Sequence, residues 1–517
     1  MPRPVVRDFA AAFVSALLLA LPYHFSFLWP LSFFAFAPYF FSLENKARGR
    51  VTFHSYIFGV LFFGMMGYWL NYVNVFGFIL LTLYMGVYFA AFGFFAARFF
   101  YPQNAGTEVS GRIKTALYLS AFWVLLEWVR SWLFSGIPWA LLSYSQWKNL
   151  PFIQIADITG AWGVSFAVML VNVLLYQFLR FKKSAIVCAY VLLGVLAVAY
   201  GYGFWSLRQW EPKDAKPSLR VSVVQGNIPQ DQKWDARVRG IIFEKYKRLT
   251  LMCANESSDL IAWPETSFPG FFEDEPVMAA HLRSTIRQAR TPTLVGAPTL
   301  GDLEGGLHFY NSAILFGANG EEGQRYSKMH LVPFGEYVPF EAVIGFIRHF
   351  VAIGHFSPGM EKTIFVLKPR LPQNYLTARF AVLVCYEDIF PGLVRDLVRH
   401  GADFLVNVTN DAWFGKTAAP YQHAQGSVFR AVENRVPVVR STNTGFSCFI
   451  SAAGRVINSV QDHGQEIQVT GHQTEGIFLR KSVSLYNRLG DWFLLLCAVL
   501  LWWSRRDRAG AQRYSRL

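Results

Sequence analysis

Three polar side chains that could together perform acyl transfer each follow a point where an apolar run ends. The run "FAVLV" stops at Cys385, which is followed at once by Tyr386 and Glu387, while "LIAWPET" leads to Glu265 and "GQRYSK" to Lys328. A thiol can attack a carbonyl carbon, a carboxylate can take the thiol proton, and an ammonium can lower the thiol pKa and stabilise an oxyanion. Strand ends of α/β domains are where such groups meet substrate. The sequence therefore predicts a Glu-Lys-Cys site.

Each of these residues also has an ordinary structural explanation when it is taken alone. A single cysteine at a strand end is more often inert than catalytic, and isolated Glu and Lys residues are usually solvated. His423 is a second possible partner for the thiol, and His330 lies close to Lys328 in sequence. The sequence has no HExxH motif and no CxxC pair, and residues 218–480 contain no phosphate-binding GxxxxGK[ST] motif. We therefore expect neither a metal nor another cofactor.

The segment from Ser218 onward alternates between strand-like and helix-like patterns. This alternation is typical of an α/β layered domain, and the Asn-Gly pair within "GANGEEGQRYSK" predicts the turn of a hairpin. The predicted strands are "LRVSVVQGN", "LIAWPET", "TLVGAPT", the hairpin strands "HFYNSAILF" and "GQRYSK", the run before Cys385, "DFLVNVTND" and "VPVVRST". The predicted helices cover residues 238–253, 277–289, 391–400 and 423–435.

The rest of the chain is apolar enough to lie in a membrane. Of all residues 53% are hydrophobic, and the runs 9–43 and 51–97 contain no Asp, Glu, Lys or Arg. Each run is long enough for two crossings of about 20 residues, with breaks expected near the prolines and asparagines of their middle parts, at Pro22, Pro30, Asn71 and Asn74. Further apolar segments cover 115–134, 160–179, 184–205 and, more briefly, 492–503.

These runs predict an α-helical membrane bundle of about eight spans joined to an α/β domain. The expected parts are a transmembrane domain of seven spans at 1–210, a catalytic domain at 218–480, an eighth span at 488–504 and a basic cytoplasmic tail at 505–517. No cleavage pattern follows the first span, so we expect it to be retained.

The net charge of +14 follows the expected topology of the chain and does not indicate nucleic-acid binding. Lys and Arg fill alternate loops between the spans, as the positive-inside rule requires. This places both termini in the cytoplasm and the large domain outside. The basic residues concerned are Arg3, Arg7, Lys46, Arg48, Arg50, Arg98, Arg112, Lys114, Arg180, Lys182, Lys183, Arg505, Arg506, Arg508, Arg513 and Arg516.

Two sets of motifs resemble known families. "WPET" around Glu265, "KMHLVPFGEYVP" around Lys328 and "VCYED" around Cys385 resemble the catalytic segments of the nitrilase superfamily over 218–480. That resemblance implies an αββα sandwich and a thioester on the cysteine. "VQGNIPQDQKWD", "NDAWFG", "RSTNTG" and the membrane segment "EWVRSWLFSGIPWALLSYSQ" resemble the apolipoprotein N-acyltransferase family over nearly the whole chain.

The second resemblance implies a ping-pong reaction at the periplasmic face of the bacterial inner membrane. A phospholipid, commonly phosphatidylethanolamine, would give its sn-1 acyl chain to Cys385. The α-amino group of the N-terminal diacylglyceryl-cysteine of an apolipoprotein would then accept it. The same resemblance implies a multi-pass membrane enzyme, and we expect this enzyme to be a monomer.

The family resemblance also extends to residues around the Glu-Lys-Cys triad. It implies that Glu336 supports the site, that Tyr386 and Glu387 flank the nucleophile, and that Trp234 and Trp413 lie near it. For Glu387 a purely structural role stays open, and both tryptophans could simply pack.

Two further points stay open from the sequence. Glu127 and Arg130 lie one helical turn apart in a predicted span, where they could be functional or could stabilise packing. The chain could also be a membrane-anchored nitrilase-type amidase in which water resolves the thioester. A transporter or receptor is a third hypothesis, and the sparse charge of the spans argues against it.

Overall fold

The chain divides into two compact units. One consists of Met1–Glu211 with Ser484–Leu517, and the other of Pro212–Val483. The computed structural model describes residues 3–100, 109–182, 186–211, 217–303, 306–338, 354–369, 377–480 and 483–514. The predicted span start at Ser184, the basic residues Lys183 and Arg516, and the end of the predicted tail lie outside the described residues.

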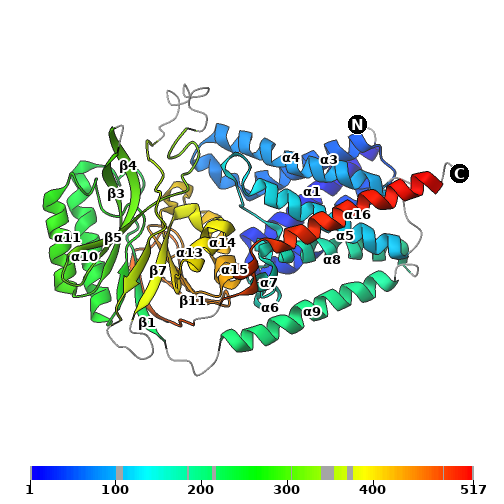
Figure 1. Cartoon of the computed structure of the whole chain (residues 1–517). Helices are drawn as coiled ribbons and strands as arrows, with labels where there is room; N and C mark the ends of the chain where they lie inside the picture. The colour runs from blue at the N-terminus through cyan, green and yellow to red at the C-terminus, as the bar shows by residue number, and fades with distance from the viewer. Residues whose placement is uncertain are drawn as a thin grey trace. The chain divides into compact units, whose positions relative to one another are not determined.

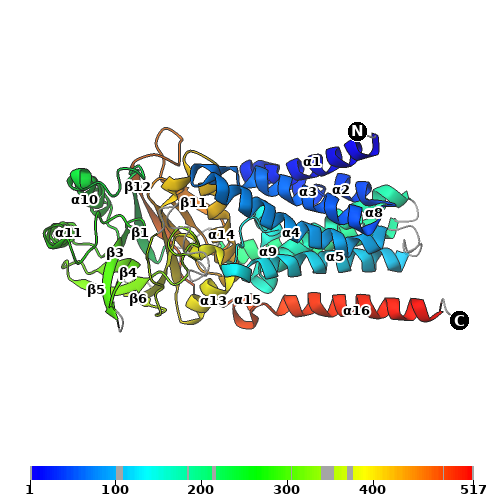
Figure 2. The same cartoon turned by 90° about the horizontal axis from the view of Figure 1, so that it is seen from above.

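The first unit is helical (Figures 1 and 2). Its long helices are α1 (Arg3–His24), α3 (Arg48–Met66), α4 (Val75–Phe100), α5 (Val109–Arg130), α8 (Ala161–Phe181), α9 (Ile186–Trp210) and α16 (Trp492–Tyr514). Short helices are α2 (Ala37–Leu43), α6 (Leu150–Ile153), α7 (Ala156–Thr159) and α15 (Leu485–Leu489), and the 3₁₀ segments are η1 (Ser26–Phe33), η2 (Tyr68–Tyr72), η4 (Leu133–Ser135) and η5 (Leu142–Gln146).

The expected breaks within the two long apolar runs are present. The first helix ends at His24, shortly after Pro22, and the chain continues as the 3₁₀ segment η1 around Pro30. In the second run η2 separates α3 from α4, and the Asn74 side chain accepts a hydrogen bond from the backbone N–H of Gly77 at 2.8 Å. Asparagine thus caps the start of α4, as its short side-chain oxygen commonly does.

Among the described residues, five helical segments are long and apolar enough to cross a bilayer: Val6–His24, Ser26–Leu43, Val75–Phe100, Ala161–Phe181 and Ile186–Trp210. Helices α5 and α16 are long enough but include charged residues within their bounds. The count of eight spans stays a prediction. Helix α16 continues to Tyr514, so most of the expected tail prolongs that helix.

The charged pair of α5 binds the irregular chain that follows this helix. The Glu127 carboxylate accepts the backbone N–H of Leu142 at 2.6 Å, and Arg130 donates to the carbonyl oxygens of Ile137 and Trp139 at 3.1 and 2.6 Å. Both side chains are buried. Buried backbone polar groups need hydrogen-bond partners, and Glu127 and Arg130 supply them for this segment. The contacts of Glu127 and Arg130 thus support the explanation that this pair stabilises packing.

The second unit holds two six-stranded sheets. The first has the order β12-β1-β2-β3-β4-β5 and the second the order β11-β10-β9-β8-β7-β6. The strands of the first are β1 (Leu219–Gln225), β2 (Leu260–Ala262), β3 (Thr293–Leu303), β4 (Gly306–Phe316), β5 (Glu322–Ser327) and β12 (Gly471–Ile477). Those of the second are β6 (Ile364–Leu367), β7 (Ala378–Val384), β8 (Phe404–Thr409), β9 (Val438–Thr442), β10 (Cys448–Ile450) and β11 (Val456–Ser459).

Each sheet has three parallel strands at its centre and antiparallel strands around them. Strands β1, β2 and β3 are parallel neighbours, as are β7, β8 and β9. Carboxyl ends of parallel strands meet at one edge of a sheet, where ligands bind in open α/β sheets. The chain segments that leave β2 and β7 carry Glu265 and Cys385 respectively.

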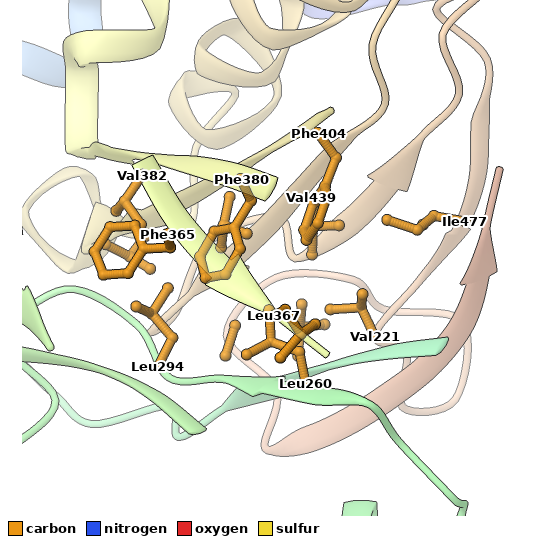
Figure 3. Close-up of a cluster of buried hydrophobic side chains, with 14 of the residues drawn as sticks. Val221, Leu260, Leu294, Phe365, Leu367, Phe380, Val382, Phe404, Val439 and Ile477 are labelled. Atoms are coloured by element: carbon orange, nitrogen blue, oxygen red, sulfur yellow. The ribbon is translucent and has the colours of Figure 1, made fainter. Parts of the chain in front are cut away.

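Helices cover the outer faces of both sheets, which gives the expected αββα order of layers (Figure 1). Helices α10 (Arg239–Asn255) and α11 (Pro276–Ala289) lie on the first sheet, and α13 (Pro391–Arg399) and α14 (Ala419–Asn434) on the second. The two sheets face each other across an apolar core, shown in Figure 3 with Phe365, Phe380 and Phe404 of one sheet above Leu260 and Leu294 of the other. Truncating such a ring to Ala typically costs about 3–5 kcal/mol, so this core fixes the spacing of the sheets.

Candidate active site

The nucleophile candidate begins a sharp turn at the end of β7. Cys385 has φ +56°, in the left-handed region, and opens the 3₁₀ turn η9 (Cys385–Ile389). Non-glycine residues pay for this conformation and keep it only where their surroundings enforce it. Here Asn407 of β8 donates its side-chain N–H to the Cys385 carbonyl oxygen at 2.8 Å. The turn is thus held so that the residue, which is partly exposed, leaves the strand toward the edge of the sheet.

Glu387 joins this nucleophile turn to the segment that carries Lys328. Its fully buried carboxylate accepts backbone N–H groups from Val384 at 2.7 Å, Met329 at 2.8 Å and His330 at 3.0 Å. It also accepts the hydroxyl of Tyr326 at 3.0 Å. Burial raises the Glu387 pKa to about 7 against the opposing effect of these N–H donors. Glu387 therefore holds the nucleophile turn and the segment after β5 together. These contacts agree with the structural role that the sequence left open for Glu387.

Lys328 directly follows β5, and its side chain lies close to two carboxylates. Its Nζ is 2.9 Å from Glu336 Oε2 and 3.8 Å from Glu265 Oε1, and the lysine side chain is fully buried. Burial by itself lowers the pKa of Lys328, but the carboxylates of Glu336 and Glu265 outweigh it and hold the pKa well above its ordinary value. Lys328 is thus a permanent cation, and the structure brings two of the three predicted catalytic residues together here.

Asn311 of β4 bridges the two carboxylates of this cluster. Its side-chain N–H₂ group donates to Glu265 Oε1 at 2.7 Å and to Glu336 Oε1 at 3.1 Å. The amide of Asn311 thus fixes the positions of both carboxylates relative to each other. Gly296 of β3 lies behind Glu265, where an added Cβ would come within 2.1 Å of the Pro264 carbonyl oxygen. Only glycine lets the turn after β2 approach the sheet this closely.

The Cys385 thiol is neutral at rest in this setting. Burial raises its pKa, the Glu265 carboxylate raises it further, and Lys328 acts in the opposite direction. The sequence predicted that Lys328 would lower the thiol pKa, and its effect has that sign, but the net shift is upward. A neutral thiol needs a base at the moment of attack. Glu265, which interacts electrostatically with the thiol, is placed for that role.

Tyr386 contacts this cluster, whereas Trp234 and Trp413 are about half exposed. The Tyr386 hydroxyl donates to the Leu331 carbonyl oxygen at 2.5 Å, and its ring centroid lies 5.3 Å from Lys328 Nζ. Trp234 and Trp413 are 46% and 51% exposed, so neither indole fills the core of the chain. Trp413 belongs to the turn η10 (Asp411–Phe414), which follows β8.

Two histidines, His423 and His330, were alternative candidates for the base that takes the thiol proton. Both ring nitrogens of His423 face carboxylates, Nε2 at 3.0 Å from Asp388 and Nδ1 at 3.0 Å from Asp411. A ring that donates from both nitrogens has no lone pair with which to accept a proton. The ring of His330 packs against Phe390 with the centroids 3.8 Å apart. The proximity of Glu265 to the thiol makes it the better candidate.

Sequence reasoning missed two residues of this site. Lys233, directly before Trp234, is buried and donates from Nζ to the Glu265 carbonyl oxygen at 3.0 Å, and burial lowers its pKa to about 8. Asn311 bridges the two glutamates. A polar residue inside the apolar strand "HFYNSAILF" was the available signal for Asn311, whereas nothing near Lys233 in sequence points to Glu265.

The two facing sheets, their helical outer layers and the Glu-Lys-Cys cluster define a carbon-nitrogen hydrolase domain of the nitrilase type. Residues 220–475 match the family model described as carbon-nitrogen hydrolase, and residues 15–174 match the model described as apolipoprotein N-acyltransferase N-terminal domain. Relatives named apolipoprotein N-acyltransferase share both parts. The protein from Geobacter metallireducens is 37% identical over 95% of this chain and 94% of its own length.

Two more relatives of that name extend this similarity to other bacteria. The protein from Methylococcus capsulatus is 32% identical over 93% of this chain and 96% of its own, and the one from Vibrio cholerae is 29% identical over 98% of each. The chain belongs to the apolipoprotein N-acyltransferase family. A solved Nesterenkonia AN1 amidase from the nitrilase superfamily aligns with 53% of this chain and 94% of its own at a TM-score of 0.38 and 18% identity, which by itself supports no conclusion.

Proposed function

We propose that this enzyme moves an acyl chain from a membrane phospholipid to Cys385 and then to the N-terminal amine of a diacylglyceryl apolipoprotein. The observation that carries the proposal is the meeting of Glu265 and Lys328, 3.8 Å apart, beside the Cys385 thiol. They come from three segments far apart in the sequence. Family membership supports the same reaction, because the relatives are named as apolipoprotein N-acyltransferases.

In the first half-reaction Glu265 takes the thiol proton as Cys385 Sγ bonds to the ester carbonyl carbon of the phospholipid. The oxyanion that forms is stabilised by Lys328 and by the backbone N–H of Tyr386. The C–O bond to the glycerol oxygen then breaks, and Glu265 returns its proton to that oxygen. A lysophospholipid leaves, and a thioester remains on Cys385. We expect phosphatidylethanolamine as the donor.

In the second half-reaction the α-amino group of the acceptor attacks the thioester carbonyl carbon. Glu265 takes a proton from the amine, the same two donors stabilise the oxyanion, and the C–S bond breaks. The thiolate leaves and recovers the proton from Glu265, so the enzyme returns to its resting state. An amide and a free thiol are the products.

The remaining predicted residues support these steps in our proposal. Glu336 holds Lys328, while Glu387 and Tyr386 fix the nucleophile turn. The half-exposed Trp234 and Trp413 offer apolar surface to the lipid. We expect Trp413→Ala to raise the apparent KM for phospholipid more than it lowers kcat. A reduced kcat with an unchanged KM would argue against lipid contact.

We also propose that the catalytic unit faces the periplasm of a bacterial inner membrane. Lys and Arg in alternate loops support this orientation. Both substrates are held in a bilayer, so an enzyme anchored there works at high effective concentration. Reporters fused after Gly301 and after Leu517 should give opposite readouts of compartment. The same readout from both would rule out the topology.

Replacing Lys328 by Met should slow acylation of Cys385 without abolishing it. Loss of one oxyanion stabiliser typically costs about 10²–10³ in rate. Lys328 also lowers the thiol pKa, so its removal raises that pKa further and moves the rate profile to higher pH. Lys328→Arg should recover little, because a planar guanidinium does not replace a compact ammonium. Rates of adduct formation between pH 6 and 10 test this, and an unshifted profile for Lys328→Met would contradict the assigned role.

The group that finally receives the acyl chain distinguishes acyl transfer from hydrolysis. The purified protein in detergent is given a phospholipid with a labelled sn-1 chain and a synthetic diacylglyceryl-cysteine peptide. We expect the label on the peptide amine, with a control peptide acetylated at its N-terminus remaining unlabelled. Label found only as free fatty acid, at the same rate with either peptide, would establish a hydrolase instead.

A further inference from the structure

A buried group of charges lies behind the nucleophile turn and takes no part in the proton transfers described above. We call it the His423 cluster and define it as Asp388, Asp411, His423, Ser427 and Arg440, all at most 1% exposed. Its members come from the turn η9, the turn η10, helix α14 and strand β9. A cluster of charges this deeply buried is retained only at a desolvation cost, so its arrangement calls for an explanation.

Hydrogen bonds fix the charge of the histidine at the centre of the cluster. Carboxylates are acceptors only, and His423 has one at 3.0 Å from each ring nitrogen. Both nitrogens must therefore donate, which makes the ring an imidazolium. On the other side of Asp388, Oδ2 accepts Arg440 Nη1 at 2.5 Å and the Ser427 hydroxyl. Asp388 is thus held by two cations and Asp411 by one.

The charged groups that face His423 agree with this assignment. Burial alone lowers the His423 pKa, Asp388 of η9 and Asp411 of η10 raise it, and Arg440 of β9 opposes them, with a result of about 9. For Asp388 the balance is the reverse. Burial raises its pKa, but His423 and Arg440 lower it below the ordinary value. The imidazolium and the Asp388 carboxylate therefore coexist across the neutral range.

The cluster reaches the reacting thiol through Asp411. The Asp411 carboxylate is near enough to Cys385 to raise its pKa, and Asp388 lies three residues after Cys385 in the same turn. In the described part of the structure Asp411 Oδ2 is buried with no hydrogen-bond partner. Gly445 packs against it, where an added Cβ would lie 2.2 Å from Oδ2. His423 is the cation in contact with Asp411, so it limits the negative charge that the thiol senses.

We propose that His423 is a positioning residue of the acyl-transfer site, a doubly donating imidazolium that ties the nucleophile turn η9 to the turn η10 and neutralises Asp411 beside the thiol. This inference rests on the proposed function. It assigns His423 no contact with substrate and no proton transfer. It explains why two carboxylates lie next to a nucleophile that must become negative.

The test uses the fact that glutamine can donate to only one of the two carboxylates. In His423→Gln the amide N–H₂ can serve one carboxylate, and its carbonyl oxygen must face the other. Replacing that second carboxylate by an amide, in His423→Gln with Asp411→Asn, restores a donor–acceptor match and removes the charge. His281→Gln, on the exposed surface of α11, is the matched control. The measurements are the rate of acyl-adduct formation on Cys385 against pH, and thermal unfolding in detergent.

We expect His423→Gln to form the adduct at least ten times more slowly at pH 7.5, with its profile moved to higher pH. The double variant should recover most of the rate and a profile near that of the wild type, and His281→Gln should match the wild type. If His423→Gln does not accumulate as folded protein, recovery of folded, adduct-forming protein in the double variant supports the proposal. Failure of both variants contradicts it.

Two further results would overturn the inference. One is a wild-type rate and pH profile in His423→Gln, and the other is an equal loss in the single and double variants with an unshifted profile. The second result would leave His423 with a role in stability alone. Failure of the proposed function is separable from both, because it is read from the wild-type protein, which would then form no adduct or would release the acyl chain only as free fatty acid.

Discussion

Glu265→Gln is expected to form no acyl adduct on Cys385 at any pH between 6 and 10. The amide keeps the shape of the carboxylate and one hydrogen-bond acceptor, but it cannot hold a proton. Because burial and Glu265 itself leave the thiol neutral at rest, the base is needed at the moment of attack. Losses of 10²–10⁴ are typical when a general base is removed, so a flat profile near zero is the expected readout.

The control for this variant is Glu244→Gln on the exposed surface of α10. It removes the same charge from the same domain and should leave the rate unchanged. The Glu265→Gln protein should unfold within a few degrees of the wild type, since Asn311 and Lys328 still have Glu336 as a partner. Normal acylation by Glu265→Gln would remove this residue from the mechanism, and His330 would then be the next base to examine.

Cys385→Ala is expected to abolish both half-reactions, and Cys385→Ser to stop after the first. A serine can be acylated slowly, but the resulting oxygen ester has a poorer leaving group than a thioester, so the acyl chain should stay on the enzyme. Mass spectrometry of the two variants after incubation with phospholipid and acceptor peptide makes the measurement. No mass increase is expected for Cys385→Ala, and a persistent one for Cys385→Ser.

Two other thiols of the same unit provide matched controls. Cys253 and Cys448 are fully buried, and burial raises the pKa of Cys253 to about 12, so it is inert as a nucleophile. Cys253→Ala and Cys448→Ala should retain activity. If either abolished acyl transfer while its protein remained folded, Cys385 would not be the nucleophile.

The central strands and their exits could be predicted from the sequence. The apolar runs before Glu265 and Cys385 mark strands, and β7 ends at Val384, directly before Cys385, while β2 ends at Ala262, three residues before Glu265. Strands β6, β10, β11 and β12 escaped prediction, whereas the edge strand β5 lies in the predicted hairpin. Strand β12 is formed by the mostly polar "GHQTEGI", which becomes a strand because it pairs antiparallel with β1. Its partner lies some 250 residues away, and no local pattern reports such pairing.

In the site, too, the features that local sequence marks could be predicted, and the contacts between distant segments could not. Glu265, Lys328 and Cys385 each have a local signature at a strand end. His423 was considered as a direct partner of the thiol, whereas its ring nitrogens are occupied by Asp388 and Asp411. The charge of a histidine depends on which groups face both nitrogens. In this chain those groups lie on two separate turns, which only the folded structure brings together.

The central claim is that Cys385 carries the acyl chain, and incubation with phospholipid alone tests it most directly. The purified wild-type protein is mixed with phosphatidylethanolamine of defined sn-1 chain, without acceptor, and its peptides are analysed by mass spectrometry. The account predicts one added acyl chain on the peptide containing Cys385, released by hydroxylamine and by the acceptor peptide. An adduct on another residue, or acyl transfer to the acceptor with no adduct at Cys385, would contradict it.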